Sequence, residues 1–159
     1  MKRFTYAVAA VAALAFGLMA VTPGHAVEKA KKVKLTTHHI AYHVDQNDPA
    51  LMNLVLNNVQ QMMEYYHSKG EQAQIEVVAY GPGLMMLRQD KSPVKDRLKR
   101  IKEGSFPSSV TYSACHNTMM KMEKKEGHAI PIVSEARVVP GGVVRLTELE
   151  EQGWTYIRP

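Results

Sequence analysis

The residues best suited to chemistry lie in the run Cys115-His116-Asn117. Cys115 is the single cysteine of the 159-residue chain, so it cannot form an internal disulfide. An apolar, strand-like run ends just before it, and a helix-like run begins just after it. A sulfur at the first turn of a helix lies near the positive end of the helix dipole, which favours the thiolate, and a protonated His116 would act in the same direction. The segment predicts either a reactive thiol that can carry a persulfide, or a buried, inert cysteine.

Two further segments place polar residues or glycines at the ends of expected strands, His43-Val44-Asp45 and Tyr80-Gly81-Pro82-Gly83. Ligands of open parallel sheets bind beyond the carboxyl ends of the strands. We therefore expect one crevice that contains Cys115 and His116 and is lined by six other residues: His43, Asp45, Tyr80, Gly81, Gly83 and Asn117. The alternative is that these residues only cap and turn the strand ends. The glycines fit no phosphate-binding pattern, so they indicate a tight turn or close approach to a small ligand.

A copper site and a hydrolase are two other interpretations. Methionines are frequent, and His38, His39 and His43 lie in one expected strand, a combination that suggests Cu(I). However, methionines at helical spacing are typical of core packing, and His39 and His43 lie roughly 13 Å apart along a strand. We therefore assign no metal ligands and expect no cofactor. A hydrolase triad of Cys115, His43 and Asp45 is possible in composition, but nothing in their spacing aligns it.

Alternating strand and helix patterns must position these residues. The expected strands are residues 33–44, 75–80, 109–114, 136–139 and 154–157. Helices are expected from Asp48-Pro49 to Lys69, from Ser92-Pro93, over 116–125, and after Pro140-Gly141-Gly142. This alternation predicts an α/β fold, a three-layer α/β/α sandwich around a mostly parallel sheet of about five strands.

The first 26 residues are typical of a secretory signal. Lys2 and Arg3 precede an apolar run of roughly 16 residues, short of the ~20 that span a bilayer, and Pro23-Gly24-His25-Ala26 resembles a cleavage site. An uncleaved anchor is the alternative. We predict a cleaved signal peptide at 1–26, a single domain at 27–159, a periplasmic location and no membrane association after cleavage.

The basic charge does not point to nucleic acid. The net charge of +5 falls to +3 once Lys2 and Arg3 leave with the signal. The remaining basic clusters, 29–34 and 95–102, contain no aromatic residues for base stacking, and Asp96 interrupts the second. We therefore predict no nucleic-acid binding.

Five segments carry a family resemblance: HVDQNDP at 43–49, IEVVAYGPGL at 75–84, SACHNTM at 113–119, VPGGVVRLTEL at 139–149 and GWTYIRP at 153–159. In their order, spacing and turn residues, the chain resembles the DsrE/DsrF-like family, in the form of a secreted member with one domain. The resemblance covers nearly all of the expected mature chain.

The resemblance implies an α/β/α fold and homo- or hetero-oligomers that include trimers and hexamers. For this chain we expect a homo-oligomer, a trimer or hexamer, and a partner protein that donates or accepts sulfur. Sulfur-relay members carry persulfide sulfur on a cysteine after the third strand, the position of Cys115. The chain departs from them in its export and in the His-Asn-Thr-Met that follows the cysteine. Roles for His43, Asp45 and His116 come from the expected crevice and not from the family.

We therefore expect a periplasmic carrier of sulfane sulfur on Cys115, more similar to a sulfurtransferase component than to an enzyme with turnover of its own. The alternative is an oligomeric, non-catalytic protein that binds a small ligand or copper and has a structural cysteine.

Overall fold

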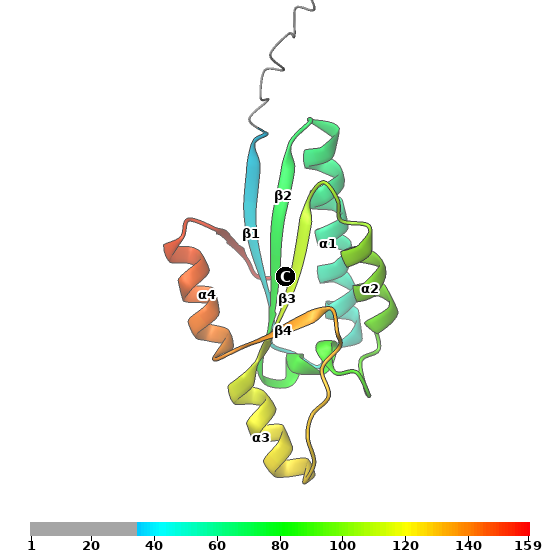
Figure 1. Cartoon of the computed structure of the whole chain (residues 1–159), viewed down its shortest axis with the longest axis vertical. Coiled ribbons are helices and arrows are strands. Elements are labelled where there is room, and N and C mark those ends of the chain that lie inside the picture. Colours follow the sequence, from blue (N-terminus) through cyan, green and yellow to red (C-terminus); the bar gives the residue numbers. More distant parts are fainter. Residues whose placement is uncertain (1–34) are drawn as a thin grey trace, which may run out of the picture. The chain divides into compact units, whose positions relative to one another are not determined.

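The sheet is parallel throughout, in the order β4-β3-β2-β1-β5. The computed structural model describes residues 35–159, which lie within one compact unit; the predicted signal peptide falls outside them. The strands of this part are β1 (Thr37–Val44), β2 (Gln72–Ala79), β3 (Ser109–Cys115), β4 (Ala136–Val139) and β5 (Thr155–Ile157) (Figure 1).

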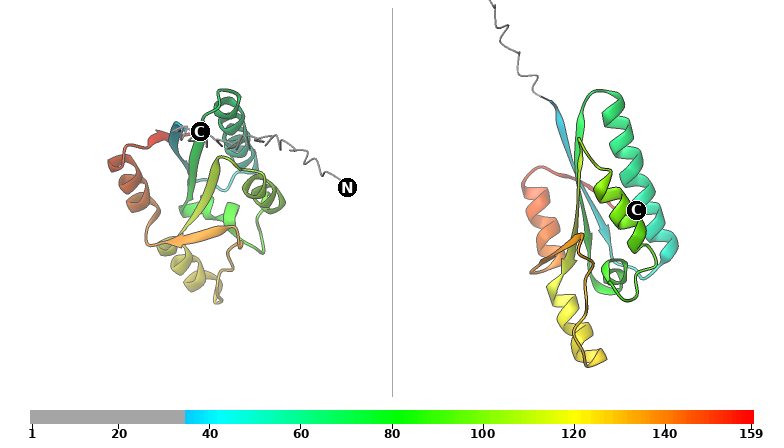
Figure 2. Two further views of the ribbon diagram at one scale, coloured as in Figure 1. Left: turned by 45° about the horizontal axis from the view of Figure 1, so that its top comes forward. Right: turned by 45° about the vertical axis from the view of Figure 1, so that its right-hand side comes forward.

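The helices between the strands are α1 (Pro49–Ser68), the 3₁₀ helix η1 (Gly81–Leu87), α2 (Lys95–Glu103), α3 (His116–Glu126) and α4 (Gly142–Glu151). In Figure 2, α1 and α2 lie on one side of the sheet and α4 on the other, while α3 extends beyond the ends of the strands. Within residues 35–159, no helix combines the length and the apolar character needed to cross a membrane.

Alternating strand residues supply two apolar layers. Tyr42, Val77 and Tyr112 belong to the larger core, on the side of α1 and α2. Ala41 and Val78 face the other way and pack in a small cluster with α4 residues. Helices therefore cover both faces, as in the predicted α/β/α sandwich, but the layer on the α4 side is thin.

Capping residues set the ends of α1 as predicted. The carboxylate of Asp48 accepts a 2.8 Å hydrogen bond from the amide of Ala50, with Pro49 in the first turn. Gly70 follows the helix with φ +71°, a conformation that glycine adopts without steric cost. No pattern predicted η1, because a short 3₁₀ helix lacks the 3.6-residue repeat that marks an α-helix.

The connection through α4 determines where a site can form. The chain leaves β2 through η1 on the α1/α2 face, whereas it leaves β4 through α4 on the opposite face and reaches β5 at the far edge of the sheet. β3 lies between these diverging connections, and Cys115 is its last residue. This is the kind of position at which open α/β sheets bind their ligands.

Candidate thiol site

Cys115 joins a strand to a helix. It ends β3, where it lies beside Val139 of β4, and it is the N-cap residue of α3 with extended backbone angles. Strand alternation places its side chain on the same face as Ser113, which is the α4 side of the sheet. The residue is only 5% exposed, so a reactant must enter a cavity to reach the sulfur.

A cavity of about 190 Å³ opens at this sulfur. Its walls come from the ends of three neighbouring strands: Tyr80 after β2, the start of α3 after β3, and the start of α4 after β4. The lining residues are Tyr80, Cys115, Asn117, Thr118, Gly141, Gly142, Val143 and Val144. Val143 and Val144 are 62% and 57% exposed, which gives the mouth an apolar rim.

The surroundings of the sulfur favour its charged form. Burial alone would raise the pKa of Cys115, but the hydroxyl of Thr118 and the backbone amides of Gly142, Thr118 and Asn117 outweigh it, and the pKa lies below its ordinary value. The side chain of Cys115 forms no capping hydrogen bond with α3. These groups therefore act as dipoles that stabilise a thiolate, as expected at a helix N-terminus.

Glycines allow the elements around the thiol to approach closely. A Cβ on Gly142 would lie 2.6 Å from the Cβ of Tyr80. Gly81 has φ +52°, and its amide donates a 2.9 Å hydrogen bond to the hydroxyl of Thr118. Gly83 packs against β1, since a Cβ there would lie 2.2 Å from the carbonyl oxygen of Val44. The close approach at Gly83 is thus to the protein's own backbone.

A buried ion network orients α4 beside the cavity. The carboxylate of Glu76, 2% exposed, accepts hydrogen bonds from Arg137 of β4, Arg145 of α4 and the hydroxyl of Ser113. Burial would raise the pKa of Glu76, but these partners outweigh it and hold that pKa below its ordinary value. Arg145 lies three residues after Gly142, so the network fixes the turn that brings the Gly142 amide to the sulfur.

His43 belongs to a neighbouring cluster. Its Nδ1 is hydrogen-bonded to the hydroxyl of Tyr156, and its Nε2 lies 3.6 Å from Oδ1 of Asp45. Burial lowers the pKa of His43, and Arg158 adds to this while Asp45 opposes it. The rings of His43 and Tyr80 are 5.8 Å apart between centroids. Tyr80 therefore stands between this cluster and the thiol cavity.

The structure brings together some of the expected crevice residues. Tyr80, Cys115 and Asn117 line the cavity, whereas His43 and Asp45 lie in the cluster beyond Tyr80. His116 is exposed and is not part of the cavity lining. Gly81 holds the first turn of α3 through its hydrogen bond to Thr118, and Gly83 packs against β1.

Two parts of the cavity are not among the residues that the sequence predicts for the crevice: Thr118 and the end of β4. Thr118 is the third residue after the N-cap, a position whose side chain commonly interacts with the cap, and this was the available signal. In the sequence, Gly141 and Gly142 indicate only a turn. Because glycine has no Cβ, they also permit close approach of a neighbouring residue, and Tyr80 lies against Gly142 in this way.

A metal site and a second, larger cavity are less well supported as functional sites. Over residues 35–159, no group of three His, Cys, Asp or Glu side chains is arranged to hold a metal ion. A larger cavity of about 370 Å³ lies between α1 and α2 near Ser108, at the amino end of β3. Its lining contains no cysteine, and it lies at the end of the sheet opposite to that where ligands of such folds bind. The smaller cavity is therefore the candidate site.

Comparison with known proteins identifies a fold relative among solved structures. The chain matches no protein-family model and no curated protein. Among solved structures it is similar to MTH1491, a protein of unknown function from Methanobacterium thermoautotrophicum, with a TM-score of 0.63 and 28% sequence identity. The match covers 77% of this chain and 99% of that one. The two proteins share a fold across almost the whole of MTH1491.

Proposed function

We propose that the protein carries sulfane sulfur as a persulfide on Cys115, and that it is a periplasmic member of the DsrE/DsrF-like family. The observation that carries the proposal is the environment of the sulfur: a single cysteine at a helix N-terminus, with its pKa lowered by Thr118 and three backbone amides, at the base of an open cavity. An inert core cysteine needs neither the amides nor the opening.

The reaction needs no added oxidant or reductant. The thiolate of Cys115 attacks the outer sulfur of a donor R–S–S⁻, so that a new S–S bond forms on the protein. The S–S bond of the donor breaks, and its electron pair leaves with R–S⁻. Thiosulfate reacts in the same way and releases sulfite. Attack by a second thiolate on the outer sulfur of the persulfide returns the cysteine to its starting state.

The groups around the sulfur favour both the thiolate and the persulfide of Cys115. The amides and the Thr118 hydroxyl that favour the thiolate also favour the negative charge of a persulfide one atom farther out. The apolar rim of Val143 and Val144 limits access of water to the reactive sulfur. We propose transfer to and from another sulfur-carrying protein, with the chain itself assembled as a homotrimer or homohexamer.

The direct test is the intact mass of the mature protein after treatment with polysulfide or thiosulfate. We expect an adduct of about 32 Da, the mass of one sulfur atom, that dithiothreitol removes. Cys115→Ser should take up none. The same protein should react with iodoacetamide under native conditions. A protein that gains no mass and whose cysteine also resists alkylation until it is denatured would contradict the proposal and favour a structural cysteine.

A further inference from the structure

Few contacts with the core fix the direction of α3. None of its eleven residues is fully buried, and its contacts with the main core come from the partly buried Met119 and Met122. A helix of this length is only marginally stable by itself in water. The angle of α3, and with it the position of the groups at its first turn, must therefore depend on contacts at particular points.

One such point is at the start of α3. The amide of Gly81, the first residue of η1, donates a 2.9 Å hydrogen bond to the hydroxyl of Thr118. Thr118 is also one of the groups that lower the pKa of Cys115. The first turn of α3 is thus attached to the start of η1 right beside the sulfur.

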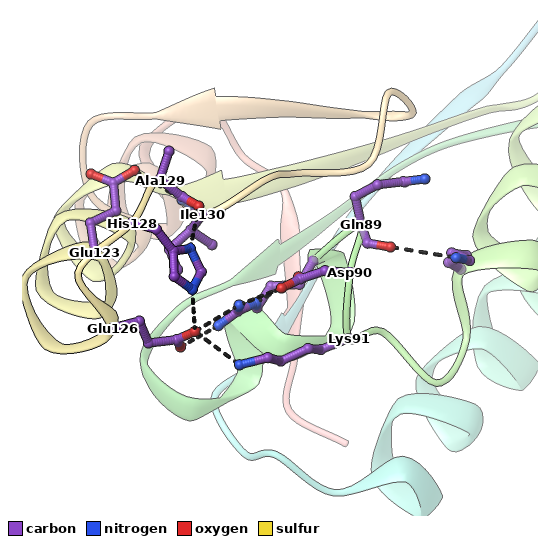
Figure 3. Close-up of polar contacts among 10 residues, drawn as sticks. Gln89, Asp90, Lys91, Glu123, Glu126, His128, Ala129 and Ile130 are labelled. Atoms are coloured by element: carbon purple, nitrogen blue, oxygen red, sulfur yellow. Dashed lines mark hydrogen bonds and ion pairs between the residues drawn. The ribbon is translucent and has the colours of Figure 1, made fainter.

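A second point is at the last residue of α3. Arg88, which follows η1 and has a fully buried side chain, donates hydrogen bonds from both Nη atoms to the carboxylate of Glu126, the bond between Nη2 and Oε2 measuring 3.0 Å. Lys91 and His128 also contact this carboxylate (Figure 3). Hydrogen bonding to Arg88, then to Lys91, lowers the pKa of Glu126 to about 2, so it is charged at any ordinary pH.

The two attachment points are separated by similar lengths along η1 and along α3. From Gly81 to Leu87, the residue before Arg88, the 3₁₀ helix η1 rises about 12 Å at ~2.0 Å per residue. From Thr118 to Glu126, an α-helix rises about 12 Å at ~1.5 Å per residue. Both contacts therefore join α3 to the segment from Gly81 to Arg88.

Arg88 is not needed to hold the segment that returns from α3. That segment is attached through backbone hydrogen bonds, from the amide of Gln89 to the carbonyl of Pro131 and from the amide of Val133 to the carbonyl of Leu87, both 2.9 Å long. The guanidinium of Arg88 instead divides its bonds between Asp90, two residues along the chain, and Glu126 of α3. Glu126 of α3 is therefore the partner of Arg88 that lies far from it in the sequence.

We propose that Arg88 is a positioning residue for the thiol: by holding Glu126 it fixes the axis of α3, and so keeps the Thr118 hydroxyl and the first-turn amides directed at the sulfur of Cys115. This inference rests on the proposed role of Cys115 as the sulfur carrier. Its test measures the acidity of the thiol and uses no sulfur donor, so the two proposals can fail independently.

The test compares two variants that each remove one carboxylate from Arg88. Glu126→Gln weakens the attachment of α3, whereas Asp90→Asn weakens a bond that does not involve α3. The rate of alkylation by iodoacetamide is measured as a function of pH for each folded variant. We expect the rate of Glu126→Gln at neutral pH to fall by about three- to tenfold, with its pH profile moved to higher pH, because a smaller fraction of the sulfur is thiolate. Asp90→Asn should follow the wild-type profile.

A double variant provides the measurement if Glu126→Gln does not fold. Removing Glu126 leaves the buried Arg88 charge short of a partner, whereas Arg88→Met together with Glu126→Gln removes both charges, a change that folded proteins often tolerate. The double variant should show the same shift of the pH profile. A wild-type profile in folded Glu126→Gln or in the double variant, or an equal shift in Asp90→Asn, would overturn the proposal.

Discussion

The side chain of Tyr80 lies directly against Gly142, so that a Cβ on Gly142 would be 2.6 Å from the Cβ of Tyr80 and 2.9 Å from its Cγ. This contact joins the end of β2 to the first turn of α4 across the thiol cavity. A clash with the Cβ of a tyrosine is not relieved by rotation of the ring, because that atom is fixed to the backbone. One of the two elements must move.

Gly142→Ala should therefore affect both stability and the thiol. We expect a loss of about 1–3 kcal/mol in the free energy of unfolding from the overpacking, measured by urea denaturation. We also expect slower alkylation of Cys115 at neutral pH, because the Gly142 amide moves away from the sulfur. Gly141→Ala is the control, since a Cβ there would meet no atom closer than 3.3 Å. Equal alkylation rates in Gly142→Ala and the wild type would show that this amide does not act on the thiol.

Gly83→Ala should destabilise the fold more strongly. A Cβ at Gly83 would lie 2.2 Å from the carbonyl oxygen of Val44 and 2.8 Å from the amide nitrogen of Asp45, both backbone atoms that cannot rotate away. We expect a loss of about 3 kcal/mol or more, seen as a lower midpoint in urea. Gly127→Ala has φ +75° but open space around it, so it should lose only about 1–2 kcal/mol. Similar losses for the two variants would contradict the close packing of η1 on β1.

The arrangement of elements could be predicted because each one carries a local signal. Asp48-Pro49 begins α1 and Gly70 follows its end, as expected from capping alone. The expected strand at 75–80 starts earlier in the structure, at Gln72, because the polar residues Gln72 and Gln74 still pair with β1. Boundaries thus shift where pairing, and not apolarity, extends a strand.

The candidate site was only partly predictable, because its members meet through strand order. The sequence placed Cys115 at the start of a helix, and the structure agrees. It could not indicate that the end of β4 closes the cavity while the end of β1 lies beyond Tyr80, since neither the order of the strands nor the path of α4 has a local signature. Glu76, a lone carboxylate in an apolar strand, was a detectable signal, but its arginine partners lie 61 and 69 residues away.

Loss of the Glu76 carboxylate should be costly. Glu76→Gln leaves the mostly buried guanidinium of Arg145 without its main partner, and we expect a loss of about 3–5 kcal/mol in the free energy of unfolding at neutral pH. Arg137→Gln should lose only about 1 kcal/mol or less, because the Arg137 side chain is half exposed and Glu76 keeps Arg145 and Ser113 as partners. Urea denaturation of both variants provides the measurement. Equal losses would indicate that the network contributes no more than a surface ion pair.

The same carboxylate should make stability depend on acid pH. The pKa of Glu76 in the folded protein is below its ordinary value of ~4.3, so the unfolded chain binds more protons as the pH falls. Its contribution is complete above that ordinary value and is lost as the pH drops through the folded pKa. Glu76→Gln should therefore lose less stability than the wild type on acidification. Parallel decreases in the urea midpoint of the two proteins would show that Glu76 does not cause the acid sensitivity.

His43 should give a second pH dependence, nearer to neutrality. Burial, with a further contribution from Arg158 and against the effect of Asp45, lowers the pKa of His43, so the unfolded chain takes up a proton at a higher pH than the folded one. The stability from neutral His43 is present above the ordinary histidine pKa and is lost as the pH falls toward the folded value. Urea midpoints compared at about pH 7.5 and about pH 5.5, which bracket the ordinary value of ~6.5, should decrease less in His43→Gln than in the wild type. Tyr156→Phe keeps the buried imidazole and should retain the wild-type dependence, because burial is the main cause of the lowered pKa. An unchanged dependence in His43→Gln would assign the effect to another group.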